Sequence, residues 1–280
     1  MVRIITDSAA DFEPAELEAM NISCIPITVI LEGQEYQENV NLSKNQFYDL
    51  LASTGGAPKT AQPSPVLLRQ LLKQAKQAGD EAVYITLSSA LSGTYQSAVM
   101  TAEDMDCDGF YIVDSRNATG RQRLLVEYAV RLRDAGHSAA EIAQAVEALR
   151  ETIVLYACID TLEYLYRGGR ISHTVYKIGS LAQVKPLIHV SPEGAIELPA
   201  KAMGMRKGMD FLAKRLELRR PSPEHTLYVM YTADRSNGEV LAQKLEELGY
   251  SIPSEHIINV VAAIGSHIGP NACGLVYVGE

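Results

Sequence analysis

The sequence predicts an α/β protein of two domains. Its first half alternates short β-rich runs with amphipathic helical patterns, which is typical of right-handed βαβ units and a mostly parallel sheet. After about residue 151 hairpins are mixed with helices, which indicates an α+β domain with a mixed sheet. A chain of 280 residues is long enough for two ordinary domains. We therefore expect an N-terminal α/β domain over residues 1–151, with its sheet flanked by helices, and a C-terminal α+β domain over residues 152–280.

The elements of the first half follow from apolar runs and helix-start signals. Ser43-Lys44-Asn45-Gln46 and Ser138-Ala139-Ala140-Glu141 are capping boxes, in which two side chains satisfy exposed N–H groups. Ser64-Pro65 combines a capping residue with proline at the first helical position. Expected strands cover residues 2–6, 23–31, 82–86 and 110–114, and expected helices cover 14–20, 43–52, 64–79, 94–104, 119–135 and 138–151.

The second half contains one strong hairpin signal. The turn Ser191-Pro192-Glu193-Gly194 separates two β-rich runs, residues 186–190 and 195–202. Further strands are expected over residues 153–159, 227–231, 257–261 and 273–278, and helices over 162–167, 206–218 and 237–248.

Composition excludes several classes of function. The formal net charge of −9 argues against binding nucleic acid or an anionic membrane through a broad basic face. The cysteines are Cys24, Cys107, Cys158 and Cys273, scattered singly among apolar residues, so we expect reduced, buried thiols. We expect no signal peptide, because Asp7 follows a short apolar start, and no membrane-spanning segment. These observations favour a cytoplasmic protein.

The most informative segment is the loop Ser88-Ser89-Ala90-Leu91-Ser92-Gly93-Thr94, between a buried strand and a helix. N–H groups at a helix start lack intrahelical partners and carry partial positive charge. Hydroxyls and a glycine beside them suit an anion, either a phosphate or a carboxylate. The alternative is that the hydroxyls only cap the helix, although a cap needs one and this loop offers four. Ser92, Gly93 and Thr94 are therefore candidate anion-binding residues.

Three further segments carry candidate residues. Each of them can also be purely structural. Residues 59–65 can be a capped helix entry, residues 167–172 a helix end, and His267 in the turn of residues 265–274 a structural histidine. In the functional interpretation, the Thr60 hydroxyl points at the same anion as Ser92, and one arginine turns inward as a fork for it. The glycines around His267 would then permit close approach of a ligand. The segments are the loop Lys59-Thr60-Ala61-Gln62-Pro63-Ser64-Pro65, the stretch Arg167-Gly168-Gly169-Arg170-Ile171-Ser172 and the turn from Gly265 to Gly274.

Motifs for other chemistries are missing. The chain has no G-x-x-x-x-G-K-[ST] or G-x-G-x-x-G sequence for a nucleotide. Ser92 with His267 could serve a hydrolase, yet the G-x-S-x-G elbow is not present. The six histidines are dispersed without metal-ligand spacing, so we expect no metal and no cofactor.

An ordered series of motifs resembles the DegV family over essentially the whole chain. The matching stretches are Ile4–Ser8, Thr60–Ser64, Ser88–Ala98, Thr161–Leu165 leading into Arg167–Ser172, Lys185-Pro186 and His267–Gly274. The resemblance implies a two-domain α/β protein that holds one long-chain fatty acid in the cleft between its domains. Such proteins act as the fatty-acid-binding subunit of a bacterial fatty acid kinase. They present the acyl carboxylate to a separate ATP-binding kinase, which makes acyl phosphate for phospholipid synthesis.

By position within the motifs, the family's carboxylate-binding hydroxyls fall on Thr60 and Ser92, with Arg170 and His267 expected at the same end of the ligand. Catalysis would then reside in the partner kinase and not in this chain. The alternatives are a serine-dependent acyl hydrolase or transferase using Ser92 or His267, and a lipid-responsive regulator with no kinase partner.

Three positions depart from the family pattern. Ala61 stands where serine is usual, which removes a polar group beside Thr60. Asn271 stands where glycine is usual after Pro270, and asparagine tolerates positive φ, so we expect the turn to survive. Met203 stands where the resemblance suggests an arginine, and this difference bears on kinase coupling but not on fatty acid binding.

Overall fold

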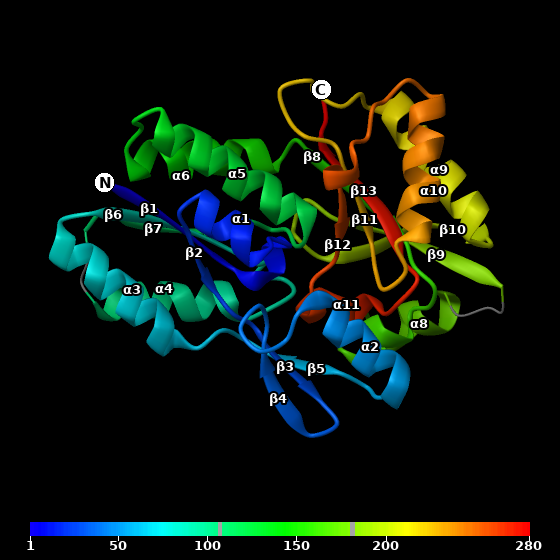
Figure 1. Ribbon diagram of the computed structural model, residues 1–280, viewed down its shortest axis with the longest axis horizontal. Helices are drawn as coiled ribbons and strands as arrows, with labels where there is room; N and C mark the ends of the chain where they lie inside the picture. Colours follow the sequence, from blue (N-terminus) through cyan, green and yellow to red (C-terminus); the bar gives the residue numbers. More distant parts are fainter. Residues whose placement is uncertain (106–107, 180–182) are drawn as a thin grey trace.

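The computed structural model describes residues 1–105, 108–179 and 183–280. Its first sheet is entirely parallel, with strand order β2-β1-β6-β7. Helices α3 and α4 cover one face of this sheet, and α5 and α6 cover the other (Figure 1). The predicted N-terminal architecture is thus confirmed. The strands are β1 (Val2–Asp7), β2 (Ile22–Ile25), β6 (Glu81–Thr86) and β7 (Phe110–Asp114), and the helices are α3 (Pro65–Ala78), α4 (Thr94–Asp104), α5 (Gly120–Asp134) and α6 (Ala139–Arg150).

The second sheet is mixed, with strand order β10-β9-β8-β13-β11-β12. Its β9–β10 hairpin matches the expected one, and helices α9 and α10 pack on one face of the sheet (Figure 1). The chain passes from the parallel to the mixed sheet between α6 and β8. The elements are β8 (Ile153–Cys158), β9 (Val184–Val190), β10 (Ile196–Met203), β11 (Tyr228–Tyr231), β12 (Ile257–Asn259), β13 (Cys273–Val278), α9 (Met205–Leu218) and α10 (Ser236–Glu247).

A small antiparallel sheet, β4-β3-β5, was not expected. The prediction of one strand over residues 23–31 is wrong, because the chain breaks at Pro26 into β2 and β3, which join different sheets. Proline has no N–H to donate to a ladder. The prediction of a loop around Thr60 is also wrong, since Thr60 lies on β5 opposite Val29. The strands are β3 (Thr28–Leu31), β4 (Gln34–Gln37) and β5 (Lys59–Ala61).

Short helices and 3₁₀ turns connect these layers. The expected turn around His267 is largely a helix, α11, and only the residues from Gly269 onward form the turn. That turn keeps its shape with Asn271, whose φ is 63°. The remaining elements are α1 (Pro14–Ala19), α2 (Lys44–Thr54), α7 (Glu163–Arg167), α8 (His173–Gly179), α11 (Ala262–Ile268), η1 (Ser8–Ala10) and η2 (Ser254–His256).

Both predicted capping boxes form. The Ser43 hydroxyl accepts from the Gln46 N–H at 3.3 Å, and Gln46 Oε1 accepts from the Ser43 N–H at 2.9 Å. Ser138 and Glu141 make the same reciprocal pair at the start of α6. These side chains satisfy helix-start donors and so fix where α2 and α6 begin.

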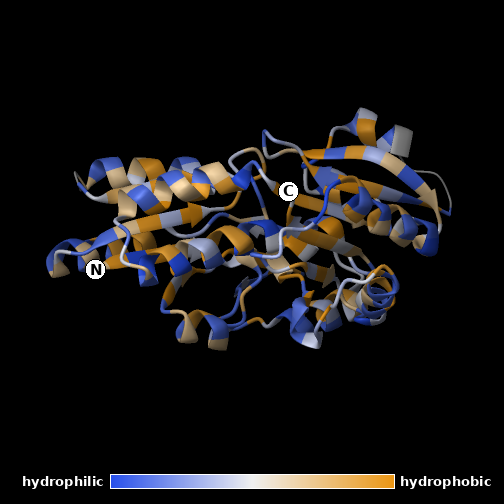
Figure 2. Cartoon of the chain, turned by 90° about the horizontal axis from the view of Figure 1, so that it is seen from above, coloured by the Kyte–Doolittle hydropathy of each residue, from blue (hydrophilic) through white to orange (hydrophobic). Residues whose placement is uncertain are grey.

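The largest apolar cluster runs through both large sheets. It joins Ile4 and Val83 of the parallel sheet to Leu155 and Val276 of the mixed sheet. Figure 2 shows the strands largely orange, whereas the outer helices alternate between blue and orange. Within the described ranges, no helix is long and apolar enough to cross a bilayer.

The described cysteines are free thiols. Cys158 and Cys273 are buried and Cys24 is half-buried. Cys107 lies outside the described residues. Burial raises the pKa of the Cys158 thiol to about 12, so this thiol is protonated and unreactive at neutral pH.

Candidate functional site

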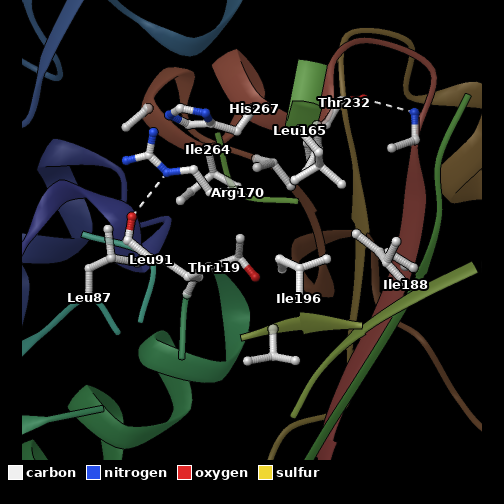
Figure 3. A pocket seen from close by; sticks show the side chains of 18 of the residues that line it. Leu87, Leu91, Thr119, Leu165, Arg170, Ile188, Ile196, Thr232, Ile264 and His267 are labelled. Carbon is white, nitrogen blue, oxygen red and sulfur yellow. Dashed lines mark hydrogen bonds between the residues drawn. The ribbon is translucent and has the colours of Figure 1, made fainter. Parts of the chain in front are cut away.

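A cavity with about 960 Å³ of empty space, part of it open to solvent, lies between the parallel and the mixed sheet. Its wall is mostly apolar and comes from the mixed sheet, from α11, from β5 and from the segments that follow β2 and β6. Figure 3 shows Arg170 and His267 close together beside Ile264, with Ile188 and Ile196 farther along the cavity. The apolar residues that line it include Ile27, Leu87, Leu91, Ala118, Leu155, Ala157, Leu165, Ile188, Val190, Ile196, Met230, Val260, Ala263, Ile264, Ile268 and Ala272.

Thr60 and His267 meet at the polar end of this cavity. Thr60 Oγ1 lies 2.8 Å from His267 Nε2, although 207 positions separate the two residues. Pairing of β5 with β3 positions Thr60, and α11 presents His267 to it. Burial, with a smaller contribution from the Arg170 charge, lowers the pKa of His267 to about 4. The imidazole is therefore neutral at pH 7, and it can donate a hydrogen bond through one nitrogen only.

Ser92 lies on the cavity wall at the start of α4. Its Oγ is 2.8 Å from Thr94 Oγ1 and accepts from the Thr94 N–H at 3.3 Å. Gly93 and Thr94 lie behind Ser92 and are not among the described residues that line the cavity. A Cβ on Gly93 would come 2.7 Å from Gln62 Oε1, so the Ser92 turn packs closely against the segment that follows Thr60.

Arg170 turns inward beside Ser92. Its Nε donates to the Leu91 carbonyl at 3.0 Å, as the dashed line in Figure 3 shows, and Nη1 donates to the Gly168 carbonyl. Burial lowers the pKa of Arg170, whose ordinary value is so high that the side chain stays charged. A cation, two hydroxyls and a neutral imidazole thus converge at one end of an apolar cavity.

The other hydroxyls of the loop have structural partners. Ser88 Oγ donates to the Gly194 carbonyl at 2.9 Å and so ties the loop to the β9–β10 hairpin. Ser89 is exposed, and its backbone N–H donates to Asp114 Oδ1 at 3.1 Å. Ser88 and Ser89 of this loop therefore make structural contacts, and only Ser92 lines the cavity.

Two residues of the site, Gly168 and Thr119, were given no role of their own from the sequence. A Cβ on Gly168 would lie 2.1 Å from His267 Nδ1, so glycine is needed for the ring to occupy its place. Thr119 lines the cavity with a φ of 55°, which is unusual for a β-branched residue. The pair Gly168-Gly169 in the sequence could have indicated close packing, but nothing along the chain connects it to His267.

The arrangement suits binding of a carboxylate more than nucleophilic catalysis. Ser92 Oγ bonds to Thr94 and His267 Nε2 bonds to Thr60, so the two would-be partners of a hydrolase pair are engaged elsewhere. None of the described residues bonds to His267 Nδ1, so no carboxylate among them orients the ring as a triad requires. Over the described residues, no group of three His, Cys, Asp or Glu side chains could hold a metal ion.

Known proteins share this fold and sequence pattern. The sequence profile of the DegV family matches residues 1–280. A DegV domain-containing protein of Clostridium perfringens is 33% identical over 285 residues, covering 99% of this chain and 97% of the relative. One from Deinococcus radiodurans is 30% identical over 278 residues, covering 98% of this chain and 97% of the relative.

Solved structures extend the comparison. A DegV family protein of Thermus thermophilus, described by its fatty acid binding, superposes with a TM-score of 0.88 at 26% identity, covering 100% of this chain and 99% of that one. DegV of Bacillus subtilis, described as a fatty acid binding protein, gives 0.83 at 25% identity, covering 100% and 99%. The match runs through both sheets and includes every segment that forms the cavity. This chain therefore belongs to the DegV family.

Proposed function

We propose that this protein binds one long-chain fatty acid, with its carboxylate at Thr60, Ser92, Arg170 and His267 and its alkyl tail in the apolar cavity. The observation that carries the proposal is the composition of that cavity, which is mostly apolar and has Thr60, Ser92, Arg170 and His267 among its few polar residues. Each buried CH₂ contributes about 0.8 kcal/mol, so a chain of about sixteen carbons gains roughly 10 kcal/mol before ordering costs. The related structures from T. thermophilus and B. subtilis, both described as binding fatty acid, support this ligand class.

The polar end supplies donors suited to a carboxylate. The Thr60 and Ser92 hydroxyls and the Arg170 guanidinium can each donate to an anionic oxygen, and neutral His267 can hold the Thr60 hydroxyl in place. Hydrogen bonds to a charged group are stronger than neutral ones. With Thr60 and Ser92 on different segments, only a folded chain presents both to one headgroup.

A direct test compares fatty acid affinity after removal of single hydroxyls. Thr60→Ala and Ser92→Ala should each weaken binding by about 1.5–3 kcal/mol, the scale of a hydrogen bond to a charged group. The measurement is displacement of a fluorescent fatty acid from delipidated protein. Ser89→Ala is the matched control, because Ser89 belongs to the same loop but its hydroxyl donates to Asp114 Oδ2 at 2.5 Å. Unchanged affinity in both test variants would place the carboxylate elsewhere.

We further propose that the bound acid is presented to a separate ATP-dependent kinase, which converts the carboxylate to an acyl phosphate. Phosphoryl transfer depends on positioning and electrostatics, and this chain supplies the positioned acyl oxygen while the partner supplies nucleotide and metal. Its own sequence has no P-loop motif. Met203, 58% exposed at the end of β10, stands at the surface where the family resemblance suggests an arginine.

The kinase step has its own test. Acyl phosphate should form when loaded protein, ATP and a fatty acid kinase are mixed, and Met203→Arg should raise the rate if the missing arginine limits coupling. Lys201→Arg, on the same strand, is the matched control. If both the wild type and Met203→Arg bind fatty acid but neither yields acyl phosphate, the result would favour a lipid-responsive regulator. Steady hydrolysis of acyl esters by the chain alone would favour an enzyme.

A further inference from the structure

A second cavity, lined by four arginines, lies where α5, the end of α6 and the segment after β7 meet strands β8 and β9 of the mixed sheet. It has about 620 Å³ of empty space, part of it open to solvent, and Arg116, Arg121, Arg150 and Arg219 line it. Among the described lining residues, Glu151 is the one carboxylate. The chain as a whole carries a formal net charge of −9, so this concentration of positive charge runs against its average.

Arg121 is a buried cation that bonds to no carboxylate of the described residues. Its side chain lies on α5, and the residue is 6% exposed. Nη1 donates to the Val190 carbonyl at 2.8 Å, Nη2 lies 3.5 Å from the Arg150 carbonyl, and Nε has no partner within the described part of the chain. Burial lowers the pKa of Arg121 to about 10, which leaves it charged at neutral pH. Burying a charge is costly unless an opposite charge accompanies it.

The other three arginines are incompletely neutralised. Glu151 Oε1 is shared between Arg116 at 3.4 Å and Arg150 at 3.2 Å. Arg219 donates to the Gly279 carbonyl at 3.1 Å, an acceptor without net charge. Glu147 lies 3.6 Å from Arg150 but is half exposed, and His189 on the cavity wall pairs with Glu197. The wall of this cavity therefore carries four guanidinium groups and, among the described lining residues, one carboxylate, which two of them share.

We infer that this cavity binds a small molecule carrying a phosphate group. Guanidinium forks match phosphate oxygens in geometry and charge, and several of them around one space give the excess positive charge that an anion requires. With four guanidinium groups on its wall, this cavity fits a hydrophilic anion better than an alkyl chain.

The site is distinct from the proposed carboxylate site. Thr60, Ser92, Arg170 and His267 line the apolar cavity, and none of them is among the described residues that line the arginine-rich one. The two cavities share Leu155 and Val190. An anion in the second cavity would thus lie against the wall of the first, with Arg121 bonded to Val190 between them.

The test is calorimetric titration of the purified chain with pyrophosphate. We expect saturable binding at one site. Arg121→Gln and Arg219→Gln should each weaken it at least about tenfold, since each removes one charge-assisted contact. Arg69→Gln is the matched control, because Arg69 is exposed on α3 and pairs with Asp104. If Arg121→Gln unfolds the chain, Arg219→Gln and Arg116→Gln at the cavity rim serve in its place.

The variants distinguish a separate phosphate site from the fatty acid site and from a lipid-binding surface. Binding that Ser92→Ala leaves intact, but Arg219→Gln weakens, supports a separate phosphate site whether or not a fatty acid occupies the first cavity. No binding of pyrophosphate, or equal loss in Arg69→Gln, would overturn the inference. So would flotation with phosphatidylglycerol vesicles in the absence of pyrophosphate binding, because the arginines would then serve a lipid surface.

Discussion

At the scale of single residues, Gly168 determines where the His267 imidazole can lie. Its φ of −73° suits any residue, so the need for glycine comes from space alone. A methyl group there would lie 2.1 Å from His267 Nδ1 and would displace the ring from Thr60. The polar end of the cavity thus depends on a residue that would not itself touch the carboxylate.

This dependence gives a prediction with an internal control. Gly168→Ala should weaken fatty acid binding by about tenfold, roughly 1.4 kcal/mol, because it disturbs the hydrogen bond that orients Thr60. In a His267→Ala background the same substitution should have little further effect, since the ring it displaces is gone. Fatty acid displacement measures all four proteins. Additive losses in the double variant would show that Gly168 acts on something other than His267.

Single residues also show where sequence reasoning stops. Thr60, Ser92, Arg170 and His267 could be singled out because each is a polar residue beside a loop or a glycine. Their convergence could not be derived, since the Thr60–His267 contact spans 207 positions. The apolar lining could not be assigned either, because a leucine facing a cavity and a leucine facing the core have the same sequence signal. Arg121 gave no signal, since arginine on an amphipathic helix is ordinarily exposed.

At the scale of elements, buried carboxylates anchor α11. Asp11 Oδ1 accepts from the Val261 N–H at 2.9 Å, and Glu38 Oε1 accepts from the Ala263 N–H at 2.9 Å. Both acids are buried, and burial raises the pKa of Asp11 to about 6 and that of Glu38 to about 7. Lys44 and Arg123 oppose the shift at Asp11 but do not cancel it. The helix that carries His267 therefore rests on two groups that titrate near neutrality.

These shifts predict that stability falls as pH rises. Folded-state pKa values above the unfolded ones mean that the folded chain holds protons that the unfolded chain releases. This stabilisation is complete below about pH 4 and is lost as pH rises through about 6 to 7. Urea unfolding from about pH 5 to about pH 8 should therefore show a decreasing free energy of unfolding.

Isosteric amides provide the comparison. Asp11→Asn with Glu38→Gln keeps both acceptor oxygens but removes both titrations, so the fall in stability with pH should become shallower. Of the groups that remain, Asp7, with its pKa raised to about 6, still contributes a fall, and His267, with its pKa lowered to about 4, contributes a rise. Asp104→Asn, at an exposed position on α4, should leave the slope unchanged. Parallel slopes in wild type and double variant would mean that these carboxyls do not govern the pH response.

Element boundaries were predicted well where chemistry marks them. Capping boxes located α2 and α6, and the turn at Gly194 located the β9–β10 hairpin, because each is a local device. The small β4-β3-β5 sheet and α11 were missed for the opposite reason. The strands of the small sheet are only three or four residues long, and in the α11 region Gly265 and Gly269 indicated a turn. In the helix, Gly265 lets Phe47 and Tyr48 pack closely against the backbone of α11, a contact that its position in the sequence does not reveal.

At the scale of the whole molecule, the proposed ligand cavity and the folding core share residues. Leu155, Val190, Met230 and Val260 belong to the largest core cluster and also line the apolar cavity. The α/β class with a parallel and a mixed sheet followed from element order, but the continuity of the core across both sheets did not. It arises because α5 packs against strands of both.

A larger side chain at the end of the cavity away from the carboxylate site should make the protein prefer fatty acids with a shorter chain. Ala157, 8% exposed on β8, faces the cavity, and Ala157→Phe would displace about four CH₂ groups at about 0.8 kcal/mol each. Affinity for an acid of about eighteen carbons should therefore fall by about 3 kcal/mol, whereas that for a much shorter acid should change little. Displacement assays across chain lengths give the comparison, with Ala52→Phe at an exposed site of α2 as control. Uniform loss at every length would place the tail elsewhere.

Because the apolar cavity and the folding core share residues, we expect an effect on the rate at which a ligand leaves. A molecule lodged among Leu155, Val190 and Met230 would contact side chains that also belong to the folding core, so its departure would leave those side chains without packing partners. Residence time, more than speed of capture, should then distinguish one acid from another. A partner protein that loosens the packing of these residues would control release of the fatty acid without competing for its carboxylate.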